Sequence, residues 1–437
     1  MMVSKPYDFT GGATLGEHSR QKHRIVRDYF RQYVKTRCQL PQQAVFRLAI
    51  VDGFAGGGRY NCGSPGSPLI FLEELLNVAE EINVSRAVNG FKSLDISCLL
   101  IFNDAKKEVV EVLKENVSPL LMTARENKHL NIEVLYGAEQ FEVVYPKLKS
   151  RLLGSAFQNV IFNLDQCGHL HVEWSTLKDI VSSFKSAEIF YTFFIDTFLA
   201  FLQRDNPEVL DRQLRPFGLN AALVQNFSED LVTKRDWLGA MERLVFDLLK
   251  GCAPFVSPFS INNPEGWRYW LVHLASSPRA REVYNVILHD CSSSQAHFGR
   301  SGLQMLHYDP KQASDVGLYL FDENGRMSAK SQLLADIPKF VEQFGDALRV
   351  NDFYAAIYNA TPAHSDDVRF AMIDNPDLEV ITPTGRERQN AHTIKLDDVL
   401  RLKRQPSFHF VSGGYPRTSD LEESDSISSA KKSEDDE

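Results

Sequence analysis

Cysteine is scarce in this sequence and is never paired at a metal-binding spacing. The 437 residues include six cysteines, scattered along the chain at Cys38, Cys62, Cys98, Cys167, Cys252 and Cys291. Because no two of them form a Cys-x-x-Cys pair, the pattern argues against a zinc ribbon and against a disulfide scaffold. Scattered cysteines are typical of a reducing compartment, so we predict a cytoplasmic protein.

Long hydrophobic runs are also missing. The longest apolar stretch covers residues 189–202, and Asp196 interrupts it. A membrane-spanning helix needs about 20 apolar residues, so this stretch is too short. The first residues, MMVSKPYDFTGG, are polar and lack the cationic and apolar regions of a signal peptide. We therefore predict no association with a membrane.

The sequence has no excess of positive charge. Its net charge is −9, and most of this comes from residues 419–437, which hold eight acidic residues and two lysines. An acidic chain is not typical of a dedicated nucleic-acid-binding protein, although a local basic patch is compatible with it. Because the tail has almost no apolar residues, we predict that residues 413–437 are disordered.

What the sequence does contain is an alternation of apolar strands and amphipathic helices. A helix is predicted over residues 17–34, and strands are predicted at residues 45–51, 98–102, 132–136, 160–164, 189–195 and 269–275. These runs are apolar throughout, which is typical of strands covered on both faces. Residues 1–335 are therefore predicted to form an α/β domain with a doubly wound, mostly parallel, Rossmann-like sheet.

Residues 336–412 follow a different pattern. Three helices are predicted at residues 337–348, 353–358 and 365–373, and a β-hairpin is predicted from residue 379 to Lys395, with Arg386 and Arg388 in its polar second strand. Helices followed by a hairpin are the arrangement of a winged helix. We therefore predict a small C-terminal winged-helix-like α+β domain.

A glycine-rich segment, DGFAGGG from Asp52 to Gly58, directly follows the first predicted strand. Glycines permit tight turns and the close approach of a ligand that a Cβ atom would obstruct. In open parallel sheets, ligands bind beyond the carboxyl ends of the strands, where this segment lies. The segment predicts a nucleotide-type pocket; a glycine-rich turn without a ligand is the alternative.

Acidic residues follow the next two predicted strands. Asp104 is placed where a carboxylate can bind the two hydroxyls of an adenosine ribose, and it is equally suited to cap the following helix. Glu139 could line an adenine, with a surface turn as the alternative. Asp52 could hold a helix amide, a water molecule or a ligand amine. The candidate cofactor-binding residues are Asp52, Phe54, Gly56, Gly58, Asp104 and Glu139.

The fourth predicted strand ends next to this pocket. Asp165 and His169 are the candidates there for orienting or deprotonating a nucleophile, with a capping carboxylate and a turn histidine as the alternatives. Cys167 is a weaker candidate, because buried cysteine usually acts as a small hydrophobic side chain. His289, Cys291, His297 and His307 lack the spacing of a preformed metal site, so we predict no metal.

At these residues the sequence resembles the three-Cys-motif partner protein (TcmP) family, a bacterial family with the fold of S-adenosylmethionine (SAM) methyltransferases. The matching segments are HSRQKH from His18, DGFAGGGRY from Asp52, GSPL from Gly66, FNDA from Phe102, HFGR from His297, GLQM from Gly302, PTGR from Pro383 and RQPSF from Arg404. The resemblance spans most of the chain. It implies a domain that binds SAM and a companion protein with a three-cysteine motif, itself similar to radical SAM proteins.

After the fourth predicted strand, the sequence differs from that of SAM enzymes that methylate base amines. Those enzymes have Asp-Pro-aromatic-Gly, whereas this chain has DQCG from Asp165. The first hypothesis is a SAM-dependent methyltransferase whose acceptor is a nucleic acid or a modified partner. The alternative is a non-catalytic partner or scaffold that docks nucleic acid or protein through its C-terminal domain. Residues 386–404, with six basic and three acidic residues, favour docking of nucleic acid, whereas the predicted recognition helix offers only Arg369 to phosphates.

Overall fold

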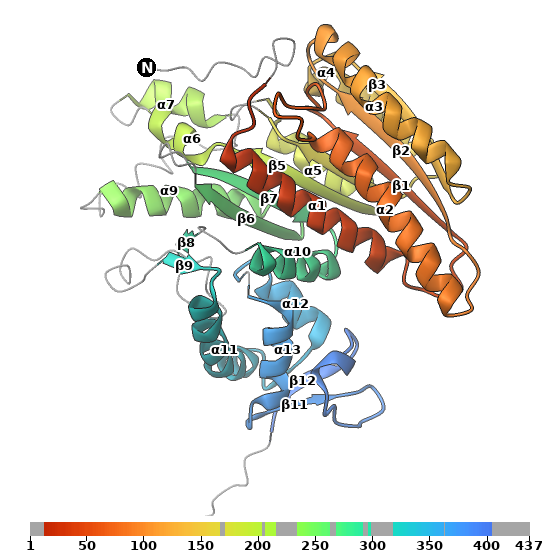
Figure 1. Cartoon of the computed structure of the whole chain (residues 1–437). Coiled ribbons are helices and arrows are strands. Elements are labelled where there is room, and N and C mark those ends of the chain that lie inside the picture. Colours follow the sequence, from red (N-terminus) through yellow and green to blue (C-terminus); the bar gives the residue numbers. More distant parts are fainter. Residues whose placement is uncertain are drawn as a thin grey trace, which may run out of the picture. The chain divides into compact units, whose positions relative to one another are not determined.

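Figure 1 shows the computed structural model of the chain. The structure describes residues 13–166, 171–202, 206–215, 234–262, 268–291, 296–298, 318–361 and 363–403. The described residues up to Leu402 belong to one compact unit. The predictions for Cys167, His169 and the acidic tail concern residues outside these ranges.

A seven-stranded sheet forms the centre of this unit. Its strands are β1 (Val45–Asp52), β2 (Asp95–Asn103), β3 (Leu130–Gly137), β4 (Asn159–Leu164), β5 (Ser186–Phe193), β6 (Phe255–Asn262) and β7 (Arg268–Ala275). They lie in the order β3-β2-β1-β4-β5-β7-β6. The first five strands in this order, β3, β2, β1, β4 and β5, run parallel to their neighbours. β7 runs antiparallel to both β5 and β6. The predicted α/β fold with a mostly parallel sheet is confirmed.

Both faces of the sheet are covered by helices. Leu48 and Ile50 of β1 pack into one core, whereas Ala49 and Val51 pack into a second core on the opposite face. The first core includes α1 (Glu17–Arg37), α2 (Ser67–Val88), α3 (Lys107–Glu126) and α10 (Pro278–Asp290), and the second includes α4 (Phe141–Leu153), α5 (Trp174–Ser183), α7 (Pro207–Leu214) and α9 (Lys234–Leu249). Figure 1 shows α1 and α2 side by side on one face. Because successive side chains of a strand point to opposite faces, burial on both faces requires the continuous apolar runs seen in the sequence.

Two parts of the sheet differ from the sequence prediction. β6 is not predicted, because Pro258 interrupts its apolar pattern. Proline is tolerated there because β6 is an outer strand that pairs with β7 alone among the described strands. The fifth strand ends at Phe193, and Asp196, its predicted end, lies in the short helix α6 (Ile195–Phe201).

A smaller module follows the sheet. It contains α11 (Glu323–Gln343), β10 (Ala347–Arg349), α12 (Val350–Ile357), α13 (Ser365–Asp374), β11 (Leu378–Ile381), the 3-10 helix η3 (Ala391–Thr393) and β12 (Val399–Leu402). Its three strands form an antiparallel sheet in the order β10-β12-β11. Between the large sheet and this module, β8 (Ala296–Phe298) and β9 (Leu318–Leu320) pair with each other.

Two boundaries of this module differ from the prediction. α11 begins earlier than residue 337, since the Asp322 side chain accepts a hydrogen bond from the Gly325 amide at 2.7 Å and caps the helix at that point. The predicted domain start at Asp336 therefore falls inside α11. The polar strand predicted around Arg386 and Arg388 is reduced to one antiparallel bridge, between Ile381 and Glu387, where the Arg388 amide donates to the Val380 carbonyl oxygen at 2.7 Å. The longer antiparallel partner of β11 is β12.

Buried polar contacts attach the module to α10. Arg281, which is fully buried, donates to the carbonyl oxygens of Tyr358 at 3.0 Å and Thr361 at 3.3 Å. Asn285 donates to the carbonyl oxygen of Ala363 at 3.0 Å. These contacts satisfy backbone carbonyl groups between α12 and α13, so the module and α10 share one buried interface.

Candidate functional site

The carboxyl ends of four parallel strands meet at one edge of the large sheet. Asp52 is in register with Phe102 on β2 and with Asn163 on β4, and Asn103 is in register with Gly137 on β3. From β1 the strand order runs outward through β2 and β3 on one side and through β4 and β5 on the other. Such a switch point is where open α/β sheets bind ligands. The structure thus places Asp52, Asp104 and Asp165 at one edge of the sheet.

The glycine-rich loop after β1 needs its glycines for two different reasons. Gly56 and Gly58 have φ angles of 60° and 78°, in the left-handed region that glycine adopts at little cost. Gly53 is required by packing, since a Cβ atom there would lie 2.7 Å from Phe141 and 2.8 Å from Leu164. At Gly53, protein side chains and not a ligand occupy the space that the missing Cβ leaves.

Asp104 faces this loop. Its Oδ2 accepts a hydrogen bond from the Gly56 amide at 3.2 Å, and its Oδ1 accepts one from the Lys106 amide at 3.0 Å. α3 begins at Lys107, so Asp104 is not the N-cap residue of that helix. The carboxylate is partly exposed and lies between the glycine loop and the start of α3. It is therefore available to a ligand that lies against the loop.

Asn103, which the sequence reasoning did not single out, holds the loops in place. Its side-chain amide donates to the carbonyl oxygens of Gly53 at 3.2 Å and Glu139 at 2.8 Å. A Cβ atom on Gly137 would lie 2.5 Å from Asn103 Oδ1. Asn103 thus joins the ends of β1, β2 and β3, and an amide can do this because it both donates and accepts hydrogen bonds.

Asp52 is fully buried at the end of β1. Its Oδ1 accepts a long hydrogen bond from the Phe54 amide at 3.4 Å. Its Oδ2 makes no hydrogen bond of good geometry to a described residue, although the side chains of Ser67 and Asn163 interact with the carboxylate. Burial raises the pKa of Asp52 to about 7, and interaction with Ser67 offsets only part of this rise. Unsatisfied buried polar atoms are rare and costly, so a further hydrogen bond to Asp52 Oδ2 would stabilise this edge of the sheet.

Asp165 forms an ion pair with Lys22 of α1. The side chain of Lys22 is 8% exposed and that of Asp165 is 27% exposed. Burial tends to raise the pKa of Asp165, but the Lys22 ammonium outweighs it and holds this pKa below its usual value. Asp165 is therefore a charged group at neutral pH and is a poor proton acceptor.

His23, one residue after Lys22, lies near Asp165 and Tyr60. Burial lowers the pKa of His23 to about 4, even though the Asp165 carboxylate raises it. His23 is consequently neutral at pH 7. α1 thus brings a lysine and a histidine to Asp165, and the sequence reasoning assigned no role to either.

Gln166 occupies the position after Asp165 and points into the protein. Its amide nitrogen donates to the Tyr191 hydroxyl at 2.9 Å and to the Thr192 carbonyl at 3.2 Å, and its oxygen accepts from the amides of His171 and Val172 at 3.0 and 3.1 Å. These four bonds use the whole amide to fix the backbone after β4. His169, the second predicted catalytic residue, lies outside the described residues.

The two remaining candidates, Phe54 and Glu139, lie in the loops that follow β1 and β3. The ring of Phe54 lies 6.0 Å from that of Phe141 and 6.4 Å from that of His171. The side chain of Glu139 is 44% exposed, and its carboxylate lies 3.5 Å from Lys147 Nζ. Glu139 therefore contributes its backbone to the site through Asn103, whereas its carboxylate is paired at the surface.

Within the described ranges, no group of three or more His, Cys, Asp or Glu side chains could hold a metal ion, and no helix is long and apolar enough to cross a membrane. Protein-family models give no match to the sequence, and no curated protein is significantly similar to it.

Proposed function

We propose that the chain is a SAM-dependent methyltransferase, with its cofactor at the crevice between β1, β2 and β4. The strand order 3-2-1-4-5, followed by an antiparallel β7 between β5 and β6, is the order expected for a SAM methyltransferase fold and supports the proposal. The observation that carries it is the Asp104 carboxylate, which lies against the Gly56 amide at the switch point of the sheet.

The residues at this edge fit the polar groups of SAM. Asp104 would accept hydrogen bonds from the ribose hydroxyls, as acidic residues after the second strand do in nucleotide-binding sheets. Asp52 Oδ2, which lacks a protein partner of good geometry among the described residues, would pair with the ammonium group of the methionine part. When bound, SAM would supply a methyl group on a sulfonium, which transfers by in-line displacement.

Asp165 is suited to orient the methyl acceptor. Because Lys22 keeps it charged, it would accept a hydrogen bond from an acceptor amine or hydroxyl and would not take its proton. Orientation is also the largest contribution that a protein makes to a displacement of this kind. Gln166 gives no base-stacking surface, since its amide is fully used inside the protein.

A second candidate function is a non-catalytic partner or scaffold. The observation that favours it is the Lys22–Asp165 ion pair, since an acceptor would have to share the Asp165 carboxylate with Lys22. Under this alternative the fold is retained for docking, and the resemblance to the three-Cys-motif partner family points to a three-cysteine-motif protein as the companion.

The C-terminal module would act as a winged-helix-like docking domain for protein. Three helices and a three-stranded antiparallel sheet support this assignment. Three arginines of the module are engaged in ion pairs: Arg369 pairs with Glu282 at 2.7 Å, Arg388 with Asp398 at 2.9 Å and Arg401 with Glu379 at 2.6 Å. Phosphate binding depends on free cationic groups, so these pairs favour a protein partner over nucleic acid.

Calorimetric titration with SAM tests the cofactor proposal. Asp104→Asn should weaken SAM binding by roughly tenfold or more, because an amide cannot accept hydrogen bonds from both ribose hydroxyls as a carboxylate does. Asp95→Asn is the matched control, since Asp95 lies on the same strand at its opposite end and is exposed. Equal affinity of the two variants for SAM, or no binding by the parent at millimolar SAM, would refute the proposal.

Labelled-methyl transfer then separates the two functions. If SAM binds, the methyltransferase should label at least one of total DNA, RNA or protein. A parent that binds SAM and labels none of these would favour the scaffold.

A further inference from the structure

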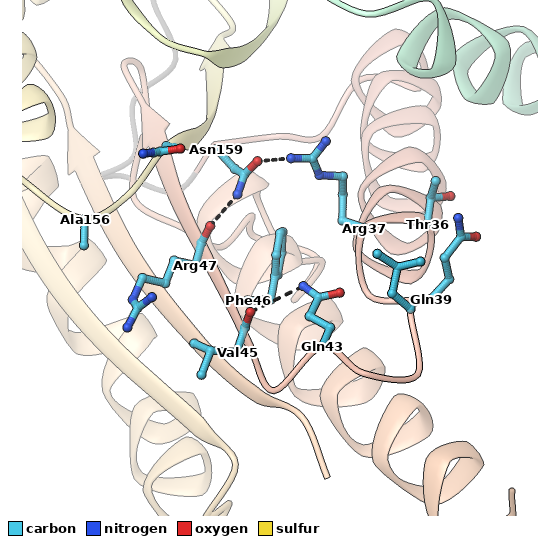
Figure 2. Close-up of a pocket in the computed structure, with 11 residues that line it drawn as sticks. Thr36, Arg37, Gln39, Gln43, Val45, Phe46, Arg47, Ala156 and Asn159 are labelled. Atoms are coloured by element: carbon cyan, nitrogen blue, oxygen red, sulfur yellow. Dashed lines mark hydrogen bonds between the residues drawn. The ribbon is translucent and has the colours of Figure 1, made fainter. Parts of the chain in front are cut away.

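The large sheet has a hollow and an open edge outside the candidate SAM site. Figure 2 shows the hollow between the end of α1 and the first residues of β1 and β4. Arg37 donates there to Asn159 Oδ1, whereas the side chain of Arg47 points away from that contact. The charged groups of the hollow therefore do not converge on one ligand. The open edge is formed by β3, and its unpaired groups follow a regular pattern.

β3 is the outermost strand at one end of the sheet (Figure 1). It covers eight residues, contains no proline and pairs with β2 alone among the described strands. Its register with β2 is continuous from Leu130 to Gly137, so no bulge interrupts it, and every residue after Leu130 is at least partly exposed. Proteins usually shorten, bend or cover such an edge, because a long regular edge pairs with a strand of another chain.

The backbone groups of β3 alternate between the two sides of the strand. At its beginning, the His129 carbonyl oxygen accepts a hydrogen bond from the Ile96 amide of β2 at 2.8 Å. At its end, the Gly137 carbonyl oxygen accepts one from the Asp104 amide at 3.3 Å. In a parallel pair, the N–H and C=O groups of one residue point to the same side, and successive residues alternate. The backbone groups that point to the open edge are therefore those of Leu130, Ile132, Val134 and Tyr136.

The side chains of β3 select one register for pairing with an identical strand. Ile132, Val134 and Tyr136 pack into the core that includes α3, whereas Leu135 packs into the core that includes α4. In an antiparallel pair, residues whose backbone groups point to the partner lie opposite each other. A pair centred on Val134 places Ile132 opposite Tyr136 and Glu133 opposite Leu135. A pair centred on Glu133 would place two carboxylates opposite each other, which is destabilising.

The charges at the two ends of β3 are opposite in sign. Lys128 precedes the strand, is exposed and has no ion-pair partner in the part of the chain that the structure describes. Glu139 follows the strand, is 44% exposed and lies 3.5 Å from Lys147 Nζ. Antiparallel pairing centred on Val134 brings the Lys128 end of one copy to the Glu139 end of the other. Because the pair has twofold symmetry, this attraction occurs twice, whereas parallel pairing would bring like charges together.

We propose that the chain forms a twofold dimer in which β3 pairs antiparallel with β3 of a second copy. The two large sheets then join into one continuous sheet, and the Val134 amide of each copy donates to the Val134 carbonyl oxygen of the other. A second copy fits this edge because its backbone groups, side chains and end charges are self-complementary, as a twofold interface requires. This inference is independent of the function proposed above.

Sedimentation equilibrium of the full chain tests the dimer, which we expect to form at concentrations up to about 100 μM. Val134→Pro removes the central N–H group from both copies and should weaken the dimer by roughly a hundredfold. In the monomer this N–H group points to the open edge, so proline removes no hydrogen bond of the sheet.

A charge reversal tests the orientation of the two strands. Lys128→Glu should weaken the dimer by roughly tenfold, because repulsion replaces attraction at two symmetric contacts. Adding Glu139→Lys to that variant should restore most of the affinity, since the two charges are then exchanged. Lys339→Glu is the matched control, because Lys339 is an exposed lysine of α11 in the C-terminal module.

Amide hydrogen exchange locates the interface. The amides of Ile132, Val134 and Tyr136 should exchange rapidly in dilute protein and more slowly at concentrations where the dimer forms. A monomeric parent, no concentration-dependent protection in β3, or a dimer that both Val134→Pro and Lys128→Glu leave unchanged would overturn the proposal. Lys128→Glu keeps the test valid if Val134→Pro fails to fold, because Lys128 is exposed.

Discussion

Asp52 and Asp398 are both completely buried aspartates, and their surroundings differ. Arg388 donates to both carboxylate oxygens of Asp398, at 2.9 and 3.0 Å, and the Lys395 amide donates to it at 2.7 Å. Asp52 accepts one long hydrogen bond, from Phe54, and interacts with the side chains of Ser67 and Asn163, while its Oδ2 lacks a partner of good geometry among the described residues. Asp398 is therefore satisfied within the C-terminal module, whereas Asp52 is a buried carboxylate with few good contacts, as its proposed ligand-binding role requires.

The largest expected effect is stabilisation by Asp52→Asn at neutral and alkaline pH. Burial raises the pKa of Asp52 to about 7, so the folded state disfavours the carboxylate that the unfolded chain carries above its ordinary pKa of 3.8. Below pH 3.8, Asp52 is mostly protonated in both the folded and the unfolded chain, so burial of the carboxylate no longer costs stability. The advantage of asparagine should therefore grow from about pH 4 to pH 7 and reach at most roughly 4 kcal/mol. Urea unfolding at several pH values measures it, and a destabilised variant at pH 8 would contradict this account.

Asp398→Asn should have the opposite sign. Asparagine has the same shape, but its amide cannot accept the three N–H groups that Arg388 and Lys395 direct at the carboxylate. We expect the free energy of unfolding to fall by about 2–3 kcal/mol. The same urea titration compares the two asparagine variants directly. If both changed stability in the same direction, the distinction between the two aspartates would be lost.

A smaller effect is expected for Lys22→Met. Lys22 opposes the effect of burial on Asp165, so without it the pKa of Asp165 should rise. The folded state of the parent gains stability from this depressed pKa. The gain is complete at pH values above the ordinary aspartate pKa, and it is lost as the pH falls through the lower pKa of the folded state. At pH 7 the variant should lose about 1–2 kcal/mol.

An exposed lysine provides the control for that variant. Lys147 is 72% exposed and pairs with Glu139, so Lys147→Met should leave stability nearly unchanged. An NMR titration of the Asp165 carboxyl carbon measures the pKa directly. An unchanged Asp165 pKa in Lys22→Met would show that the ion pair does not control this group.

Much of the fold could be predicted because parallel strands buried on both faces leave continuous apolar runs. The ends of those runs also located Asp52, Asp104 and Asp165, since the carboxyl ends of parallel strands share one edge. β6 was missed because Pro258 breaks its pattern, and its position as an outer strand depends on the whole sheet.

The side-chain contacts that fix the charge and position of the site residues could not be predicted from the sequence. Lys22 and Asp165 are 143 positions apart in the sequence, and no local pattern indicates that α1 crosses the end of β4. Asn103 and Gln166 likewise act through hydrogen bonds to distant backbone groups. Their sequence signal is only that each is a polar residue next to an apolar strand, which is also typical of any turn.

The most direct test of the central claim is the SAM affinity of the parent and of Asp52→Asn, measured by calorimetry at pH 6 and pH 7. If the Asp52 carboxylate pairs with the ligand ammonium, the parent should bind several-fold more tightly at pH 7, where a larger share of Asp52 is ionised, and the variant should bind weakly at both pH values. Parent affinity that is independent of pH and equal to that of Asp52→Asn would contradict the account.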